Sequence, residues 1–227
     1  MDAYESTREY WKSKDVSSQE ALAAELQTYM VLFAWQNCLL EDLDVSADEV
    51  RAAFFEDGAQ TPGEAGRLLA NQRRCFELLL LPLAAAGEDL TPELVERVNA
   101  LLCEGMDIEA DDEDDSLTPE ELREALVTLL GEVNAYDGPE ALRAAAYFAA
   151  KLEYLQPFTG FCGLTARILA SHFLLVREEP PLVFFEKDAE RYFDALETYD
   201  IGEDLRPLEK LMREQTVETW KTLLSRK

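Results

Sequence analysis

Apolar residues along most of the chain recur at intervals of three and four residues, the spacing that places them on one face of an α-helix. Period-two alternation is rare, and residues 182–185 form the one compact β-favouring run. We therefore expect an all-α protein. The predicted helices span residues 18–43, 46–56, 63–86, 92–104, 119–135, 139–155, 164–176, 188–199 and 204–225.

Helix-start signals support this assignment. At several positions a hydroxyl side chain can accept from free backbone amides, and a Glu three residues later can reach back to the cap amide. Proline directly follows three of these caps, where its missing amide proton costs nothing. The expected pairs are Ser17 with Glu20, Ser46 with Glu49, Thr61 with Glu64 and Thr118 with Glu121, and Thr91 with Leu94 is a weaker case without the acid.

The composition suits one soluble domain. The chain has 227 residues, 48% of them apolar, which is enough for one substantial core. Its N-terminus is polar, and no apolar run approaches the roughly 20 residues that a membrane span needs, so we expect a cytoplasmic protein without membrane contact. The cysteines lack the close spacing of zinc sites and are expected to be free thiols: Cys38, Cys75, Cys103 and Cys162.

The net charge of −26 argues against nucleic acid and anionic lipid as partners, because like charges repel. A solvated acidic surface is the simplest explanation, and adaptation to high salt or an acidic face for a basic partner are alternatives. The acidic run 109–115 is expected to be a surface loop. It does not fit a calcium loop, because the glycine and closing Glu of that motif are missing, so we predict no metal site.

Residues 144–170 carry the most informative pattern. An apolar helix should end before Pro157, a turn follows with Gly160 and Gly163, and a second helix should begin near Leu164. Free amides at a helix N-terminus can bind an anion.

This segment resembles the active-site motif of the Fic/Doc family, H-P-F-x-D/E-G-N-G-R-x-x-R between two central helices. The matching positions are Pro157, Phe158, Gly163 and Arg167. The positions that depart from the motif are Gln156, Gly160, Phe161, Cys162 and Leu164. The resemblance, which covers roughly residues 30–220, implies a Fic-like helical bundle. We expect the chain to form a single domain, residues 1–227, with N-terminal helices in residues 1–60 and a Fic core in residues 61–227.

A second likeness lies near the N-terminus. The segment 33–42 is similar to the family's inhibitory helix, S/T-x-x-x-E-G/N, with Asn37 at the hydroxyl position and Glu41 at the acid. In autoinhibited members this Glu meets the second motif Arg, which corresponds to Arg167. The pair is either a remnant of regulation or an ion pair that holds the N-terminal helix over a vestigial cleft.

The departures remove the groups that the family chemistry needs. Gln156 replaces the His that accepts a proton from the target hydroxyl. Gly160 supplies no carboxylate for Mg²⁺, and Leu164 replaces the Arg that grips phosphates. Phe161 stands where a glycine lets the backbone curl round the phosphates. Loss of one catalytic group commonly costs about two to four orders of magnitude in rate, and here base, metal ligand and phosphate clamp are missing together.

Other side chains carry weaker signals. Cys162 lies near a helix N-terminus, which would lower a thiol pKa, but no base is evident beside it. His172, the sole histidine, is expected to serve packing or the surface. The family's β-hairpin flap should be short, because residues 105–115 offer little that could pair as strands. Four aromatic residues are expected in the core: Tyr147, Phe148, Tyr154 and Phe158.

These observations predict a Fic-fold pseudoenzyme that lacks adenylyl transfer, needs no cofactor and acts by binding a protein partner. The alternative is a divergent transferase of a nucleotidyl or other phosphate-containing group, which uses non-standard residues such as Cys162 or Glu41 and which binds ATP and Mg²⁺. A helical scaffold without a ligand is the third possibility.

Overall fold

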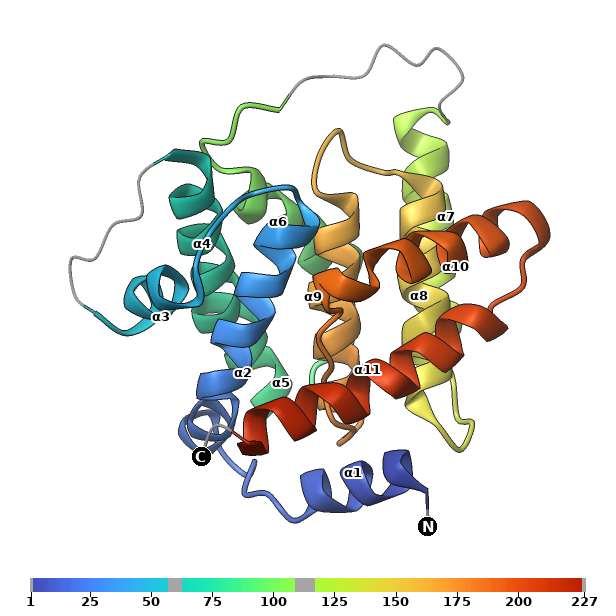
Figure 1. The fold of residues 1–227 in the computed structure, drawn as a ribbon. Helices are drawn as coiled ribbons and strands as arrows, with labels where there is room; N and C mark the ends of the chain where they lie inside the picture. Colours follow the sequence, from blue (N-terminus) through green and yellow to red (C-terminus); the bar gives the residue numbers. More distant parts are fainter. Residues whose placement is uncertain (1, 57–62, 109–116, 226–227) are drawn as a thin grey trace.

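The computed structural model describes residues 2–56, 63–108 and 117–225, and within these ranges it contains helices and no strand (Figure 1). This confirms the all-α prediction. The α-helices are α1 (Ala3–Lys12), α2 (Gln19–Leu40), α3 (Ala47–Phe55), α4 (Gly63–Cys75), α5 (Leu81–Ala85), α6 (Pro92–Cys103), α7 (Pro119–Asn134), α8 (Ala141–Leu155), α9 (Cys162–Val176), α10 (Ala189–Gly202) and α11 (Arg206–Ser225).

Helix α9 lies at the centre of the bundle (Figure 1). Every residue from Leu164 to Leu174 is buried, so this helix has no solvent-facing stripe. A helix that is buried on all sides needs neighbours on all sides. Helices α5, α6 and α8 pack directly against it. The loop between α8 and α9 is thereby held at one end of the core.

The predicted helix 63–86 is continuous but irregular. A π-helical turn, Phe76–Leu80, joins α4 to α5, and Pro82 lies in the first turn of α5. Proline has no amide proton to donate, and a wider turn ahead of it accommodates this loss and the bulk of its ring.

Three of the expected helix caps are present. Ser46 and Thr118 form complete capping boxes with Glu49 and Glu121, and Thr91 accepts from the amide of Leu94 at 3.1 Å. The expected cap at Ser17 is wrong: Ser18 caps α2, while Ser17 bonds to Asp15. The expected pair Thr61 with Glu64 includes a residue outside the described ranges.

The helix α1 was not anticipated from the sequence, because most of its residues are polar. Asp2 caps it by accepting from the amide of Glu5 at 2.8 Å. Tyr4 and Trp11, seven residues apart, are its buried side chains, and the Trp11 ring lies 5.1 Å from that of Trp220 on α11. Two aromatic anchors at helical spacing therefore dock α1 without a continuous apolar stripe.

The β-favouring run 182–185 is buried and lies outside the helices, and it pairs with no strand in the described part of the chain. Its amides bond to side chains instead. The amide of Val183 donates to Thr219 Oγ1 and that of Phe185 to Gln215 Oε1, both at 2.9 Å, and Glu186 donates to Gln36 Oε1 at 2.8 Å. Polar side chains of α11 and α2 thus satisfy backbone groups that a sheet would otherwise satisfy.

Candidate functional site

The loop between α8 and α9 contains two residues with left-handed backbone conformation. Gln156 ends α8 with φ 43°, and Phe161 precedes α9 with φ 54°. Positive φ is uncommon for a residue with a large side chain. Helix α9 begins at Cys162, two residues before the expected start at Leu164, because the turn is completed at Phe161.

Gln156 is exposed, and its side-chain amide donates to the backbone oxygen of Glu153 at 2.6 Å. The side chain therefore folds back onto the end of α8. An amide has no nitrogen that titrates near neutral pH, so it cannot accept a proton from a hydroxyl group. Pro157 and Phe158 follow it and are half-buried.

Gly160 lies in a confined position. Its carbonyl oxygen accepts from Asn99 Nδ2 at 2.8 Å, and the same amide group donates to Thr165 Oγ1 at 3.1 Å. A Cβ at Gly160 would lie 2.9 Å from Cγ2 of Ile108. An acidic side chain could enter here only if Ile108 moved.

Leu164 points into the core. The side chain of this residue is fully buried, whereas a phosphate-gripping group has to reach an accessible surface. The first-turn position of α9 that the Fic motif gives to an Arg is therefore part of the hydrophobic packing.

The guanidinium of Arg167 is buried, with 3% of the side chain exposed, and it is held by two residues of the α2 C-terminus. Nε donates to Asn37 Oδ1 at 2.6 Å, and Nη2 donates to Glu41 Oε1 at 2.5 Å. The guanidinium carbon lies 5.7 Å from the ring centroid of Tyr192 on α10. The structure thus brings together the three residues singled out in the sequence as an inhibitory-like set.

Two further residues complete this polar cluster, and the sequence reasoning missed both. Tyr192 donates its hydroxyl hydrogen bond to Glu153 Oε1 at 3.0 Å. Burial raises the pKa of Glu153, and the positive charge of Arg167 partly offsets that rise. We call Asn37, Glu41, Glu153, Arg167 and Tyr192 the Arg167 cluster.

A sequence signal for Glu153 exists in retrospect. It follows the fully buried Ala149 and Ala150 by four and three residues, so helical spacing places it on the edge of the buried face of α8. A carboxylate at that edge requires a cation or a hydrogen-bond donor nearby.

Gly163 packs against the Arg167 cluster, which leaves no room for a Cβ at this position. A Cβ added there would lie 2.5 Å from Glu153 Oε1 and 3.0 Å from Arg167 Nη1. Glycine therefore lets the ionic side chains of α8 and α9 approach the backbone. This is one of the four positions that match the Fic motif, and here it serves the packing of charged groups.

The thiol of Cys162 differs from the expectation of a lowered pKa. Burial raises its pKa to about 11, because a thiolate would be desolvated. The thiol donates to the backbone oxygen of Phe158 at 3.1 Å. At this position the rise in pKa caused by burial exceeds any lowering by the helix N-terminus.

His172 lies elsewhere in the core. It is fully buried, and its Nε2 donates to the backbone oxygen of Glu88 at 2.9 Å. Burial lowers its pKa. Of the four aromatic residues expected in the core, Phe148 is fully buried, whereas Tyr154 is 52% exposed and that prediction is wrong. The Lys151 ammonium lies 4.5 Å from its ring centroid and covers part of it.

Across the described part of the chain, no group of three or more His, Cys, Asp or Glu residues is arranged to hold a metal ion. None of the described helices is long and apolar enough to cross a bilayer. The expected flap and acidic loop fall largely in residues 109–116, outside the described ranges.

No protein-family model and no curated protein matches the sequence. Solved structures do match the fold. Fic-1 from C. elegans superimposes with a TM-score of 0.79 at 17% identity, over 98% of this chain and 69% of that chain. A Fic domain containing signaling protein from Bacteroides thetaiotaomicron also gives 0.79, at 14% identity, over 96% and 95% of the two chains. A Fic family protein from Desulfovibrio desulfuricans gives 0.69, at 14% identity, over 89% and 69%. The arrangement of α8, the loop and α9 within this helical bundle is therefore that of the Fic fold.

Proposed function

We propose that this protein is a Fic-fold pseudoenzyme that does not transfer nucleotides and acts by binding a protein partner. One observation carries the proposal: Arg167, the only basic residue between positions 156 and 167, is buried and already bound by Glu41 and Asn37. A triphosphate approaching this loop would meet no free cation from it.

The remaining loop positions support the same conclusion. Gln156 cannot act as a general base, and Gly160 has no side chain to hold Mg²⁺. Leu164 is part of the core. The residues at the positions of the general base, the metal ligand and the phosphate-binding Arg therefore cannot accept a proton, hold Mg²⁺ or bind a phosphate.

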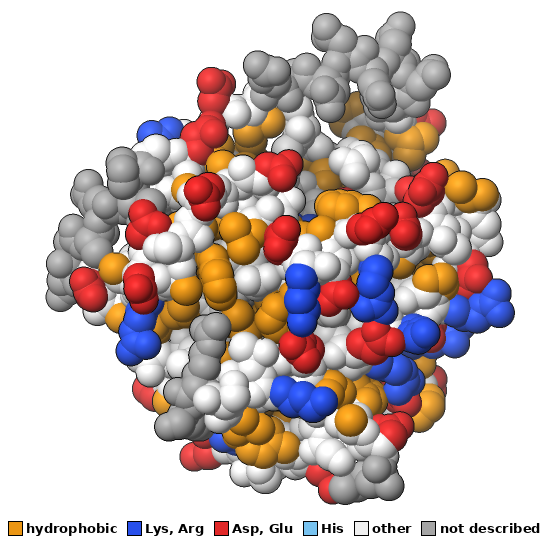
Figure 2. Space-filling model, in the orientation of Figure 1, with side chains coloured by type: hydrophobic (Ala, Val, Ile, Leu, Met, Phe, Trp, Pro, Cys, Tyr) orange, Lys and Arg blue, Asp and Glu red, His pale blue; other side chains and the backbone are white. Residues whose placement is uncertain are grey.

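The surface charge favours a basic protein partner. In the view of Figure 2, basic side chains gather over α10 and α11. Arginines of these two helices form ion pairs with acids: Arg191 with Glu214, Arg206 with Asp204 and Arg213 with Glu140, and Lys187, just before α10, pairs with Glu218. Because acidic residues outnumber basic ones by 26 over the whole sequence, the protein would attract a cationic surface.

Nucleotide binding separates a pseudoenzyme from an autoinhibited enzyme. Calorimetric titration of Mg·ATP should give no heat of binding with the wild-type protein or with Glu41→Ala, in which Arg167 keeps Asn37 but loses its anionic partner. Heat in the variant alone would mean that Glu41 inhibits a working site, and the pseudoenzyme assignment would fail.

Partner binding has its own test. Affinity capture from the organism of origin at physiological salt should recover a basic protein whose retention falls as salt is raised, because screening weakens attraction between exposed charges. Recovery of no protein at physiological salt would count against a binding role.

The divergent-transferase alternative would use Cys162 or Glu41. Burial holds the Cys162 thiol in its unreactive protonated form, and Glu41 is paired with Arg167. Incubation with labelled ATP, CTP or UTP, Mg²⁺ and lysate should therefore leave no label on any protein. Label that depends on Cys162 would establish the alternative.

A further inference from the structure

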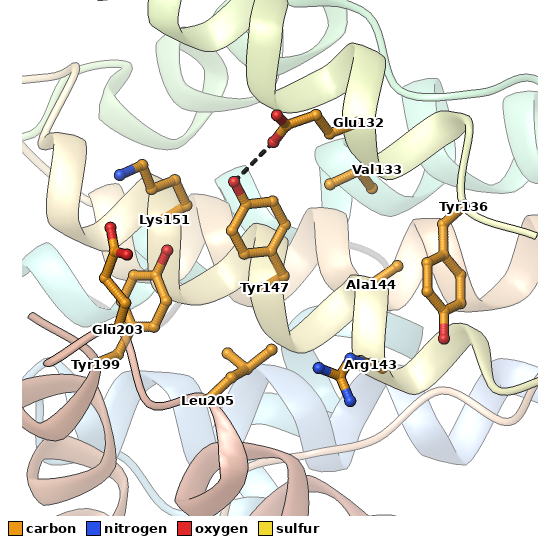
Figure 3. A pocket seen from close by; sticks show the side chains of 10 residues that line it. All are labelled: Glu132, Val133, Tyr136, Arg143, Ala144, Tyr147, Lys151, Tyr199, Glu203 and Leu205. Carbon is orange, nitrogen blue, oxygen red and sulfur yellow. Dashed lines mark hydrogen bonds between the residues drawn. The ribbon is translucent and has the colours of Figure 1, made fainter. Parts of the chain in front are cut away.

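A pocket lies between α7, α8 and the connection from α10 to α11, and it shares no residue with the 156–167 loop (Figure 3). Its volume is about 350 Å³, within the range of small-ligand sites. Its apolar lining residues are Val133, Ala144 and Leu205. The other lining residues are aromatic or charged.

Two tyrosine rings form a corner of the pocket. Tyr147 on α8 and Tyr199 on α10 meet edge to face, with ring centroids 6.5 Å apart and an interplanar angle of 72°. The rings come from different helices, and Tyr147 stands in the middle of the lining in Figure 3. Aromatic faces carry negative electrostatic potential and attract cations.

Two carboxylates flank the rings. Glu132 accepts the hydroxyl hydrogen bond of Tyr147 at 2.7 Å, and Glu203 lies beside Tyr199 (Figure 3). A hydroxyl donor does not cancel a carboxylate charge. Among the described residues neither Glu132 nor Glu203 forms an ion pair.

The two basic residues of the lining engage groups outside it. Arg143 Nε lies 3.5 Å from Glu209 Oε1, and the Lys151 ammonium lies over the Tyr154 ring. Each of the two tyrosines therefore has a carboxylate beside it, Glu132 at Tyr147 and Glu203 at Tyr199. Burial raises the pKa of Tyr199 to about 12, and Glu203 adds to that rise.

We propose that this pocket binds an organic cation, an alkylguanidinium or alkylammonium group whose charge lies between Glu132 and Glu203 and whose stem packs on the tyrosine rings and Leu205. Such a group could come from a small metabolite or from a basic side chain of a protein partner. The pocket would bind such a cation whether or not the 156–167 loop is catalytically active.

Calorimetric titration with propylguanidine, propylurea and butyrate tests the charge requirement. Propylurea has nearly the same shape as propylguanidine but no charge, and butyrate reverses the sign. Propylguanidine should bind with a Kd of about 1 mM or tighter, and the other two probes should bind more weakly. Absence of propylguanidine binding, or equal binding of propylurea, would overturn the proposal.

Variants locate the site. Glu203→Gln should weaken propylguanidine binding about two- to fivefold, and the double variant with Glu132→Gln should weaken it further. Glu190→Gln, at the exposed far end of α10, removes the same charge outside the pocket and should have no effect. An unchanged affinity in the double variant, or equal weakening in the control, would refute a site at this place.

A pentapeptide with one central Arg distinguishes the two sources of the cation. Binding tighter than that of propylguanidine identifies a protein side chain as the ligand, and weaker binding identifies a free small molecule. Both results support the cation site, and loss of peptide and propylguanidine binding together contradicts it.

Discussion

The hydroxyl group of Tyr192 donates to Glu153 at 3.0 Å, beside the guanidinium of Arg167. Glu153 comes from α8, Arg167 from α9 and Tyr192 from α10, while Asn37 and Glu41 come from the end of α2. Four helices thus meet at one buried cation. Because a buried charge is costly without partners, this cluster constrains how those helices pack.

The contact between Glu41 and Arg167 should stabilise the fold. Glu41→Gln removes the charged acceptor of a buried guanidinium, which keeps its bond to Asn37, so we expect a loss of about 1–3 kcal/mol in the free energy of unfolding. Urea denaturation measures this loss in the free energy of unfolding. Asp42→Asn is a matched control, because Asp42 is exposed and its positive φ of 55° is tolerated by Asn. Equal losses in both variants would show that general charge, and not the pair, is responsible.

The raised pKa of Glu153 makes stability depend on pH in a defined direction. A carboxyl group whose folded pKa lies above its unfolded value of 4.5 contributes stability below that value and loses this contribution as pH rises through the folded pKa. The free energy of unfolding of Glu153→Gln, relative to that of the wild type, should therefore rise as the pH is raised from 4 to 7. Urea denaturation of the wild type and the variant at pH 4 and at pH 7 measures this change. Glu124→Gln, at an exposed position, is the control. A relative loss with rising pH would contradict the desolvation argument.

Local sequence signals predicted most helices because their chemistry is local. A capping box such as Ser46 with Glu49 and a proline in the first turn such as Pro119 act within four residues, so they can be identified without knowing the fold. Helix α1 was missed because its stability depends on Trp11 meeting Trp220, a contact between opposite ends of the chain.

The candidate site could be predicted only in part for the same reason. A family motif identified the Asn37, Glu41 and Arg167 positions, which lie together in the structure. Tyr192 and Glu153 belong to no motif pattern, and their roles follow from how α8 and α10 pack. The pKa of Cys162 was misjudged because burial depends on tertiary contacts, which the nearby helix N-terminus does not indicate.

His172 offers a direct spectroscopic test of core burial, because it is the only histidine in the chain. Burial lowers its pKa below the ordinary value of 6.5, so the imidazole should remain neutral to a lower pH in the folded protein than in the unfolded chain. The stability that neutral His172 contributes is present above 6.5 and is lost as pH falls through the folded pKa. The NMR titration of its Cε1 proton measures this, and a midpoint at or above that of the urea-unfolded chain would refute it.

The docking of α1 should depend on Trp11. Its side chain is 2% exposed and packs on Trp220, so Trp11→Ala should remove about 3–5 kcal/mol from the docking of this helix. Arg8, which bonds to the buried Glu179 through Nε at 2.6 Å, would then hold α1 without its aromatic anchor. Trypsin should cleave after Lys12 and Lys14 much faster in this variant than in Ser13→Ala, a control at an exposed neighbouring position that keeps both cleavage sites. Equal cleavage rates would mean that the polar contacts, and not the tryptophan pair, hold α1 on α11.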